Sequence, residues 1–226
     1  MELYKYCKFE HMQLLLKKGG LRVGTLFDYR NRGKYGEMSS DKNEGRTEIT
    51  GNIIFYDYKH ISSILVKSSV NTTGKGENQL RHFKNETLYT DNLYTFSAAS
   101  AYTEEDHKKW YEKEGYDACY LIHSARLFFR AISMEIDIGN FVCFGPIHYF
   151  DETKSNQIFE GHFHPALIKN RVFGSQFEVR ALWSPKLSST EIDPIIIKNS
   201  NANKYCSPFR VIQAGKFVSD MNLQNS

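Results

Sequence analysis

The chain has 226 residues, of which 41% are hydrophobic and 14% aromatic, and its formal net charge is +3. This length fits one domain, residues 1–226, with a sizeable core, and the apolar share excludes an intrinsically disordered chain. The charge is too small to indicate a nucleic-acid partner by itself.

The cysteines and the apolar runs bear on the compartment. Four cysteines lie far apart in the sequence, at Cys7, Cys119, Cys143 and Cys206. No charged segment followed by an apolar one precedes the first predicted strand, so we expect a cytoplasmic protein with reduced thiols. No apolar run approaches the roughly 20 residues that cross a bilayer, and we expect no membrane partner.

The first predicted elements are a strand at 3–6 and a helix at 9–18, where apolar residues recur at helical spacing. Gly19 follows two lysines, which is typical of a helix end. A second predicted strand at 21–27 leads into a polar, glycine-punctuated stretch. We expect this stretch, 28–46, to be a functional surface loop.

The rest of the chain is rich in strands. Strands are predicted at 47–58, 61–66, 88–96, 117–122, 141–147, 176–183 and 192–197, helices from 103 and at 125–132, a turn at 68–78, a loop at 160–165 and a frayed tail after 220. Strands and helices do not alternate regularly. The pattern therefore indicates an α+β fold with mixed, mostly antiparallel sheets and a few helices.

The stretch 176–183 has two faces that differ in polarity. Because side chains alternate along a strand, Gln176, Glu178 and Arg180 lie on one face and apolar side chains on the other. An antiparallel strand with one face in solvent explains this pattern. A cleft explains it equally, because a carboxylate fixed on a rigid strand can stabilise positive charge on a substrate. On the second interpretation Glu178 is a candidate catalytic residue.

Several common sites are disfavoured by the sequence. It has neither a P-loop lysine nor a Gly-x-Gly-x-x-Gly turn, which argues against a P-loop NTPase or a Rossmann dehydrogenase. The run 162–164, with Cys143 and His148, resembles part of a metal site, but its spacing matches no zinc pattern, and we expect no metal. A Cys–His nucleophilic pair is another interpretation, although such cysteines are more often small buried groups.

Three segments together resemble the motifs of ADP-ribosyltransferase-like domains. The opening strand 3–6, followed by a helix and a strand, resembles their Leu-Tyr-(His or Arg) motif. Lys5 or Tyr6 stands where those domains usually have His or Arg. The stretch 94–100 stands in the place of the second motif, whose Ser-Thr-Ser it only approximates. Gln176-Phe177-Glu178 matches the third, Gln-x-Glu. The opening also resembles uncharacterised bacterial domains, often near phage-defence genes, that begin Leu-Tyr-(Lys or Arg)-Tyr.

The resemblance implies an ADP-ribosyltransferase-like split sandwich and NAD as the substrate. It implies that Glu178 stabilises positive charge on the ribose, that Gln176 orients the acceptor, and that Ser97 holds Glu178 or the nicotinamide ribose. Stacking on the nicotinamide and contacts with the diphosphate are expected from Tyr4, Lys5, Tyr6, Arg22, Arg30 and Tyr102.

The resemblance further implies a bacterial toxin or phage-defence effector that modifies a nucleic acid or a protein, with a neutralising antitoxin as another partner. A second class of function is a non-catalytic module that binds a nucleotide or nucleic acid through the loop at 22–46. Basic residues alternate there with tyrosines, but acids leave the loop nearly neutral. A nuclease is disfavoured, because no closely spaced acids fall on predicted strands.

Overall fold

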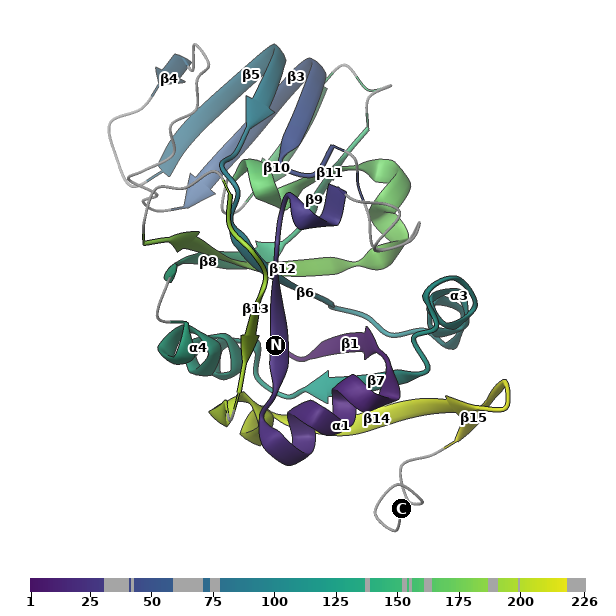
Figure 1. Cartoon of the computed structure of the whole chain (residues 1–226). Coiled ribbons are helices and arrows are strands. Elements are labelled where there is room, and N and C mark those ends of the chain that lie inside the picture. The colour runs from purple at the N-terminus through teal and green to yellow at the C-terminus, as the bar shows by residue number, and fades with distance from the viewer. Residues whose placement is uncertain are drawn as a thin grey trace.

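A computed structural model describes residues 1–30, 41, 43–58, 71–73, 78–136, 139–151, 154, 156–160, 164–186, 191–198 and 200–218. Within these residues the chain forms fifteen strands, three α-helices and four short 3-10 helices (Figure 1). Most strand pairs are antiparallel, which confirms the predicted α+β class.

The largest sheet has nine strands, and all its pairings are antiparallel. They are β1 (Leu3–Cys7), β2 (Leu21–Thr25), β6 (Tyr94–Ala99), β7 (Ala118–Ile122), β8 (Gly139–Pro146), β12 (Glu178–Pro185), β13 (Ile195–Ile197), β14 (Cys206–Gln213) and β15 (Lys216–Val218). The order is β13-β2-β6-β1-β7-β14-β15, and β12 lies between β6 and β8.

This sheet divides at β6. One edge of β6 pairs with β12 along its whole length. The other edge pairs with β2 only at Tyr94 and Thr95, and with β1 only at Ala99. The two partner strands therefore diverge in between, and residues 96–98 of β6 face a gap in the described pairings. We call this gap the fork.

Three α-helices are described: α1 (Phe9–Lys18), α3 (Glu104–Glu114) and α4 (Ala125–Glu135). α1 ends at Gly19, whose φ of 63° is left-handed and suits glycine. Leu15 of α1 and Phe129 of α4 pack in one core with Val179 and Trp183 from β12. The apolar face of β12 is thus turned to this core, as predicted. No helix in the described ranges has both the length and the apolar character to span a membrane.

Two smaller sheets complete the structure. One contains β3 (Arg46–Tyr58), β4 (Asn71–Thr73), β5 (Asn78–Tyr89) and β10 (Asn156–Glu160), and the other contains β9 (His148–Phe150) and β11 (Ile168–Asn170). The pairs β10–β3 and β11–β9 are parallel. In Figure 1 the four-stranded sheet lies at the top and β1, β7 and β14 at the bottom, with β6 and β12 between them.

Four 3-10 helices link these strands: η1 (Asp28–Arg30), η2 (Pro165–Leu167), η3 (Arg171–Gln176) and η4 (Asn201–Tyr205). η3 corrects the prediction of one strand over 176–183. Gln176 ends η3, Phe177 has a positive φ of 45°, and β12 begins only at Glu178. The alternating pattern of polar residues concealed this turn.

Other predictions have mixed outcomes. The helix at 9–18 and the strands at 3–6 and 47–58 are confirmed to within one residue at each end. The predicted strand 88–96 is wrong, because β5 ends at Tyr89 and β6 begins only at Tyr94. Between these strands, the side chain of Asn92 accepts a hydrogen bond from the backbone N–H of Phe27. The predicted turn at 68–78 contains β4. The hairpin β14–β15 was not predicted. Residues 61–66 and the tail after 220 lie outside the described residues.

Candidate functional site

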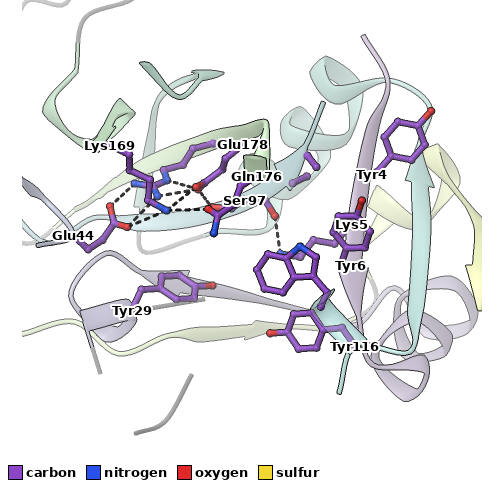
Figure 2. Close-up of a pocket in the computed structure, with 14 residues that line it drawn as sticks. Tyr4, Lys5, Tyr6, Tyr29, Glu44, Ser97, Tyr116, Lys169, Gln176 and Glu178 are labelled. Atoms are coloured by element: carbon purple, nitrogen blue, oxygen red, sulfur yellow. Dashed lines mark hydrogen bonds and ion pairs between the residues drawn. The ribbon is translucent and has the colours of Figure 1, made fainter. Parts of the chain in front are cut away.

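The fork opens into a pocket, which Figure 2 shows in close-up. It contains about 670 Å³ of empty space, a volume that includes its open mouth. Its walls are formed by Tyr4, Lys5, Tyr6, Tyr29, Glu44, Ser97, Ala98, Ala99, Trp110, Tyr116, Lys169, Gln176, Glu178 and Arg180. The pocket therefore brings together segments from nearly the whole described chain.

Glu178 lies at the centre of the polar wall. The register of β12 against β6 pairs Arg180 with Ser97, so the side chains of both residues lie on the same face as Glu178. The Ser97 hydroxyl donates a hydrogen bond of 2.6 Å to Oε1 of Glu178. The backbone N–H of Glu178 donates to the hydroxyl of Tyr149, 3.0 Å away. These contacts fix the orientation of the carboxylate.

Arg180 connects two carboxylates. Its Nε and Nη2 lie 2.9 and 2.8 Å from Oε1 of Glu178. Its Nη1 and Nη2 donate to the two oxygens of Glu44 at 2.5 and 3.1 Å, and Nη1 also donates to the carbonyl of Ala166 at 2.7 Å. Arg180 is 2% exposed and Glu44 is 4% exposed. The polar face of β12 is therefore buried in the protein, which excludes the solvent-facing interpretation.

Lys169 adds a second cation from β11. Its Nζ donates to Oε2 of Glu178 at 2.8 Å and to Oε1 of Gln176 at 3.5 Å, and it lies 3.8 Å from Glu44. Gln176 thus reaches the pocket from η3 rather than from the strand. Two acids and two cations balance one another in this network, which we call the four-charge network: Glu44, Lys169, Glu178 and Arg180.

The protonation of Glu178 follows from these neighbours. Burial by itself would raise the pKa of this carboxyl, but Arg180 and Lys169 lower it more, and the pKa falls well below its usual range. The two carboxylates in turn raise the pKa of Arg180 further above its ordinary value, against the effect of burial. Glu178 is therefore ionised at neutral pH. It can stabilise positive charge or accept hydrogen bonds, but it cannot donate a proton.

Lys5 reaches across the fork from β1. Its Nζ donates to the carbonyl of Ser97 at 2.7 Å and lies 5.0 Å from the centre of the Phe96 ring. Burial lowers the pKa of Lys5 below the ordinary lysine value. Lys5 thus lies in the pocket wall, in an environment that disfavours its charged form.

Aromatic rings form the opposite wall. The ring of Trp110 stacks on Tyr116, with centroids 5.4 Å apart and an interplanar angle of 4°, and on Tyr6 at 6.0 Å. Tyr29 from η1 packs over Gly24, where an added Cβ would lie 2.8 Å from the ring. In Figure 2 Tyr29 and Tyr116 both lie below the charged side chains. Flat rings on one wall and charges on the other suit a ligand that has both a planar ring and polar groups.

Three predicted ligand residues lie elsewhere. Arg22 forms an ion pair with Asp28, and neither belongs to the pocket wall. Arg30 lies over the ring of Phe27, 3.6 Å from its centre, and donates to the backbone carbonyl of Glu44. Its role is therefore to hold the Glu44 turn in place.

Tyr102 lies behind the pocket wall, where its ring packs against those of Tyr4, Tyr6 and Phe209. It supports Tyr6 and does not line the pocket. Of the predicted residues, the structure brings six to the pocket: Tyr4, Lys5, Tyr6, Ser97, Gln176 and Glu178.

Glu44 and Lys169 are pocket residues that sequence analysis missed. Glu44 lies in a predicted surface loop, and Lys169 on a three-residue strand with no recognisable pattern. A weak signal for the turn at Glu44 was Gly45, whose φ is 73°. Only the tertiary structure places these side chains beside Arg180.

The groups considered for a metal site are dispersed. His162 and Phe163 lie outside the described residues. His164 Nδ1 accepts a hydrogen bond from the backbone N–H of Ala166, and Cys143 is buried in an apolar cluster. In the described part of the chain, no three His, Cys, Asp or Glu side chains are placed to hold a metal ion.

Comparison of the chain with family models, with curated proteins and with solved structures finds no match in any of the three. A function for this chain must therefore be inferred from the pocket itself.

Proposed function

We propose that the pocket binds NAD and transfers its ADP-ribose to an acceptor. The observation that carries the proposal is the 2.6 Å hydrogen bond between Ser97 and Glu178 inside this pocket. It joins the second and third segments that resemble ADP-ribosyltransferase motifs, although they are 81 positions apart in the sequence. The forked sheet supports a split-sandwich arrangement, with the third segment directly beside the second.

In the proposed reaction the bond between nicotinamide and ribose breaks, and nicotinamide leaves with the bonding electrons. The sugar then carries positive charge, as in other glycosyl transfers. An ionised Glu178 stabilises this charge. An oxygen or nitrogen of the acceptor then bonds to the same sugar carbon, and its proton passes to water. Glu178 does not take that proton, because its pKa is far too low.

The Glu178 carboxylate has a hydrogen-bond acceptor position available for the sugar. Each carboxylate oxygen offers about two acceptor positions, and among the described residues Oε2 receives one hydrogen bond, from Lys169. The second position can accept a ribose hydroxyl. Ser97 acts as a positioning residue for the carboxylate, and Gln176, at the rim on η3, is placed to orient the acceptor.

The aromatic wall and the cations complete the proposed binding mode. Nicotinamide stacks on Tyr6 or on the Trp110–Tyr116 pair. The diphosphate lies near the two cations of the four-charge network. These cations replace Arg22 and Arg30, which the sequence had suggested for this role. We propose a nucleic acid or a protein as the acceptor, in a toxin or phage-defence effector, with an antitoxin as a further partner.

A non-catalytic nucleotide-binding module is the second candidate. It is favoured by the ion pairs of Glu178, because Lys169 and Arg180 already neutralise the carboxylate that would stabilise the sugar cation. On this alternative the same pocket binds a nucleotide without cleaving it.

Labelled NAD added to a cell lysate tests the proposal. The wild-type chain should release nicotinamide and transfer label to protein or nucleic acid, and Ser97→Ala and Glu178→Gln should lose both activities. Glu105→Gln, at an exposed side chain of α3, is the matched control and should remain active. Thermal unfolding checks that each variant folds. If the wild-type chain binds NAD without releasing nicotinamide, the binding module replaces the transferase.

A further inference from the structure

Lys5 differs from the other lysine of the pocket in its partners. Lys169 contacts two carboxylates and an amide oxygen. The Lys5 amine, in contrast, has a neutral hydrogen-bond partner, the backbone carbonyl of Ser97 at 2.7 Å. No carboxylate lies within ion-pair distance of Lys5 among the described residues. One amine is thus locked in ion pairs and the other is not.

Lys5 also lines the pocket. Its side chain is partly exposed and belongs to the pocket wall, whereas that of Lys169 is 7% exposed. Figure 2 shows Lys5 close to Tyr6 on β1, with its amine directed to Ser97. Lys5 therefore borders the space that a ligand can occupy.

Burial favours a neutral Lys5 amine. Burial lowers the pKa of Lys5, and Arg22 on β2 lowers it further. Glu178 on β12, Cys7 on β1 and Cys119 on β7 raise it, but the balance remains a lowered pKa. The neutral fraction, which is the nucleophilic form, is therefore larger at a given pH than for a surface lysine.

We propose that Lys5 is a nucleophilic amine that forms a reversible imine with the carbonyl group of a ligand bound in this pocket. The Lys5 nitrogen bonds to the carbonyl carbon, and the resulting carbinolamine loses one water molecule. Hydrolysis by water reverses the reaction, so no oxidant or reductant is required. This site is independent of NAD cleavage.

The ligand class follows from the walls of the pocket. Tyr6, Trp110 and Tyr116 offer flat rings in the pocket that Lys5 also lines, and Trp110 stacks on Tyr6 at 6.0 Å. A planar ring that carries an aldehyde or ketone can stack there while its carbonyl group reaches Lys5. The chemistry therefore points to aromatic or heteroaromatic carbonyl compounds.

Pyridoxal, an uncharged heteroaromatic aldehyde, is the probe. The full chain is incubated with pyridoxal near neutral pH, reduced with borohydride and mapped by peptide mass spectrometry. Lys5 should be labelled faster than an exposed lysine such as Lys18, because a lowered pKa leaves more of the amine neutral at a given pH. Labelling that spreads over surface lysines and spares Lys5 would overturn the proposal.

Three variants make the test specific. Lys5→Arg keeps a cation and a donor for Ser97, and should lose the label, whereas Lys18→Arg should keep it on Lys5. Glu178→Gln removes a charge that raises the pKa of Lys5, so labelling of Lys5 should persist or become faster. Loss of NAD cleavage in that variant together with intact labelling separates this proposal from the proposed transferase activity. Slower labelling in folded Glu178→Gln would contradict it.

Discussion

Glu178 is held in one orientation by donors from three separate segments: Ser97 on β6, Lys169 on β11 and Arg180 on β12. Such a carboxylate is pre-organised, since it needs no rearrangement when charge develops beside it. The cations that fix it also reduce its net charge. The extent to which Glu178 stabilises a bound cation therefore depends on whether a ligand takes over the contacts of Lys169 or Arg180.

The Glu44–Arg180 pair is expected to contribute strongly to stability. Glu44→Ala leaves a buried guanidinium with one carboxylate in place of two, and removing one partner of a buried pair costs about 3 kcal/mol. The free energy of unfolding in urea measures this loss. Glu48→Ala is the control, because Glu48 is exposed and its loss should change stability by less than about 0.5 kcal/mol. Equal effects of the two substitutions would contradict a structural role for Glu44.

The burial of His164 is expected to make the free energy of unfolding depend on pH. Burial lowers its pKa from 6.5 to about 4, so the unfolded chain binds more protons between these values. Stability should therefore be complete above about pH 6.5 and fall by up to ~3 kcal/mol as the pH drops to 4. His164→Asn, which keeps an acceptor for the backbone N–H of Ala166, should flatten this slope, and His11→Asn on the surface should not. Urea midpoints at several pH values measure the difference.

At the scale of elements, the junction between η3 and β12 determines where the carboxylate points. Phe177 occupies this junction with a φ of 45°, in the left-handed region that bulky residues seldom adopt. Its backbone carbonyl accepts hydrogen bonds from the backbone N–H and the hydroxyl of Ser100, which hold the turn against the end of β6. The strain is thus located one residue before Glu178.

Phe177→Asn is expected to relieve this strain. Asparagine tolerates a left-handed backbone, and the phenyl ring is 48% exposed, so little packing is lost. We expect a gain of about 0.5–1 kcal/mol in the free energy of unfolding. Val172→Asn, in the preceding 3-10 helix η3 and 79% exposed, should be neutral. If Phe177→Asn is clearly destabilising, the ring has a packing role that its exposure does not indicate.

At the scale of the molecule, local sequence patterns predicted the helices and strands better than they predicted which segments contact one another. Helical spacing and Gly19 defined α1, and alternation identified the two faces of β12. Both signals arise within a few residues. The α+β class followed from them, since it depends only on the kinds of element and their order.

The candidate site was predictable only in part. Ser97 and Glu178 were expected together because of the resemblance, and the structure joins them by a hydrogen bond. Glu44 reaches Arg180 from a turn and Lys169 reaches Glu178 from a short strand, where no periodic pattern exists. Arg22 was expected at the pocket because it is a cation, but Asp28 binds it elsewhere. Charge alone does not reveal which partner a side chain will find.

The proposed catalytic role of Glu178 is tested most directly by measuring NAD binding and nicotinamide release separately in Glu178→Gln. We predict that kcat for nicotinamide release falls about a thousandfold while the Kd for NAD changes little, because the carboxylate acts on charge that develops in the transition state. Glu105→Gln should match the wild-type chain in both values. Nicotinamide release that continues at the wild-type rate in folded Glu178→Gln would contradict the proposed role of this residue.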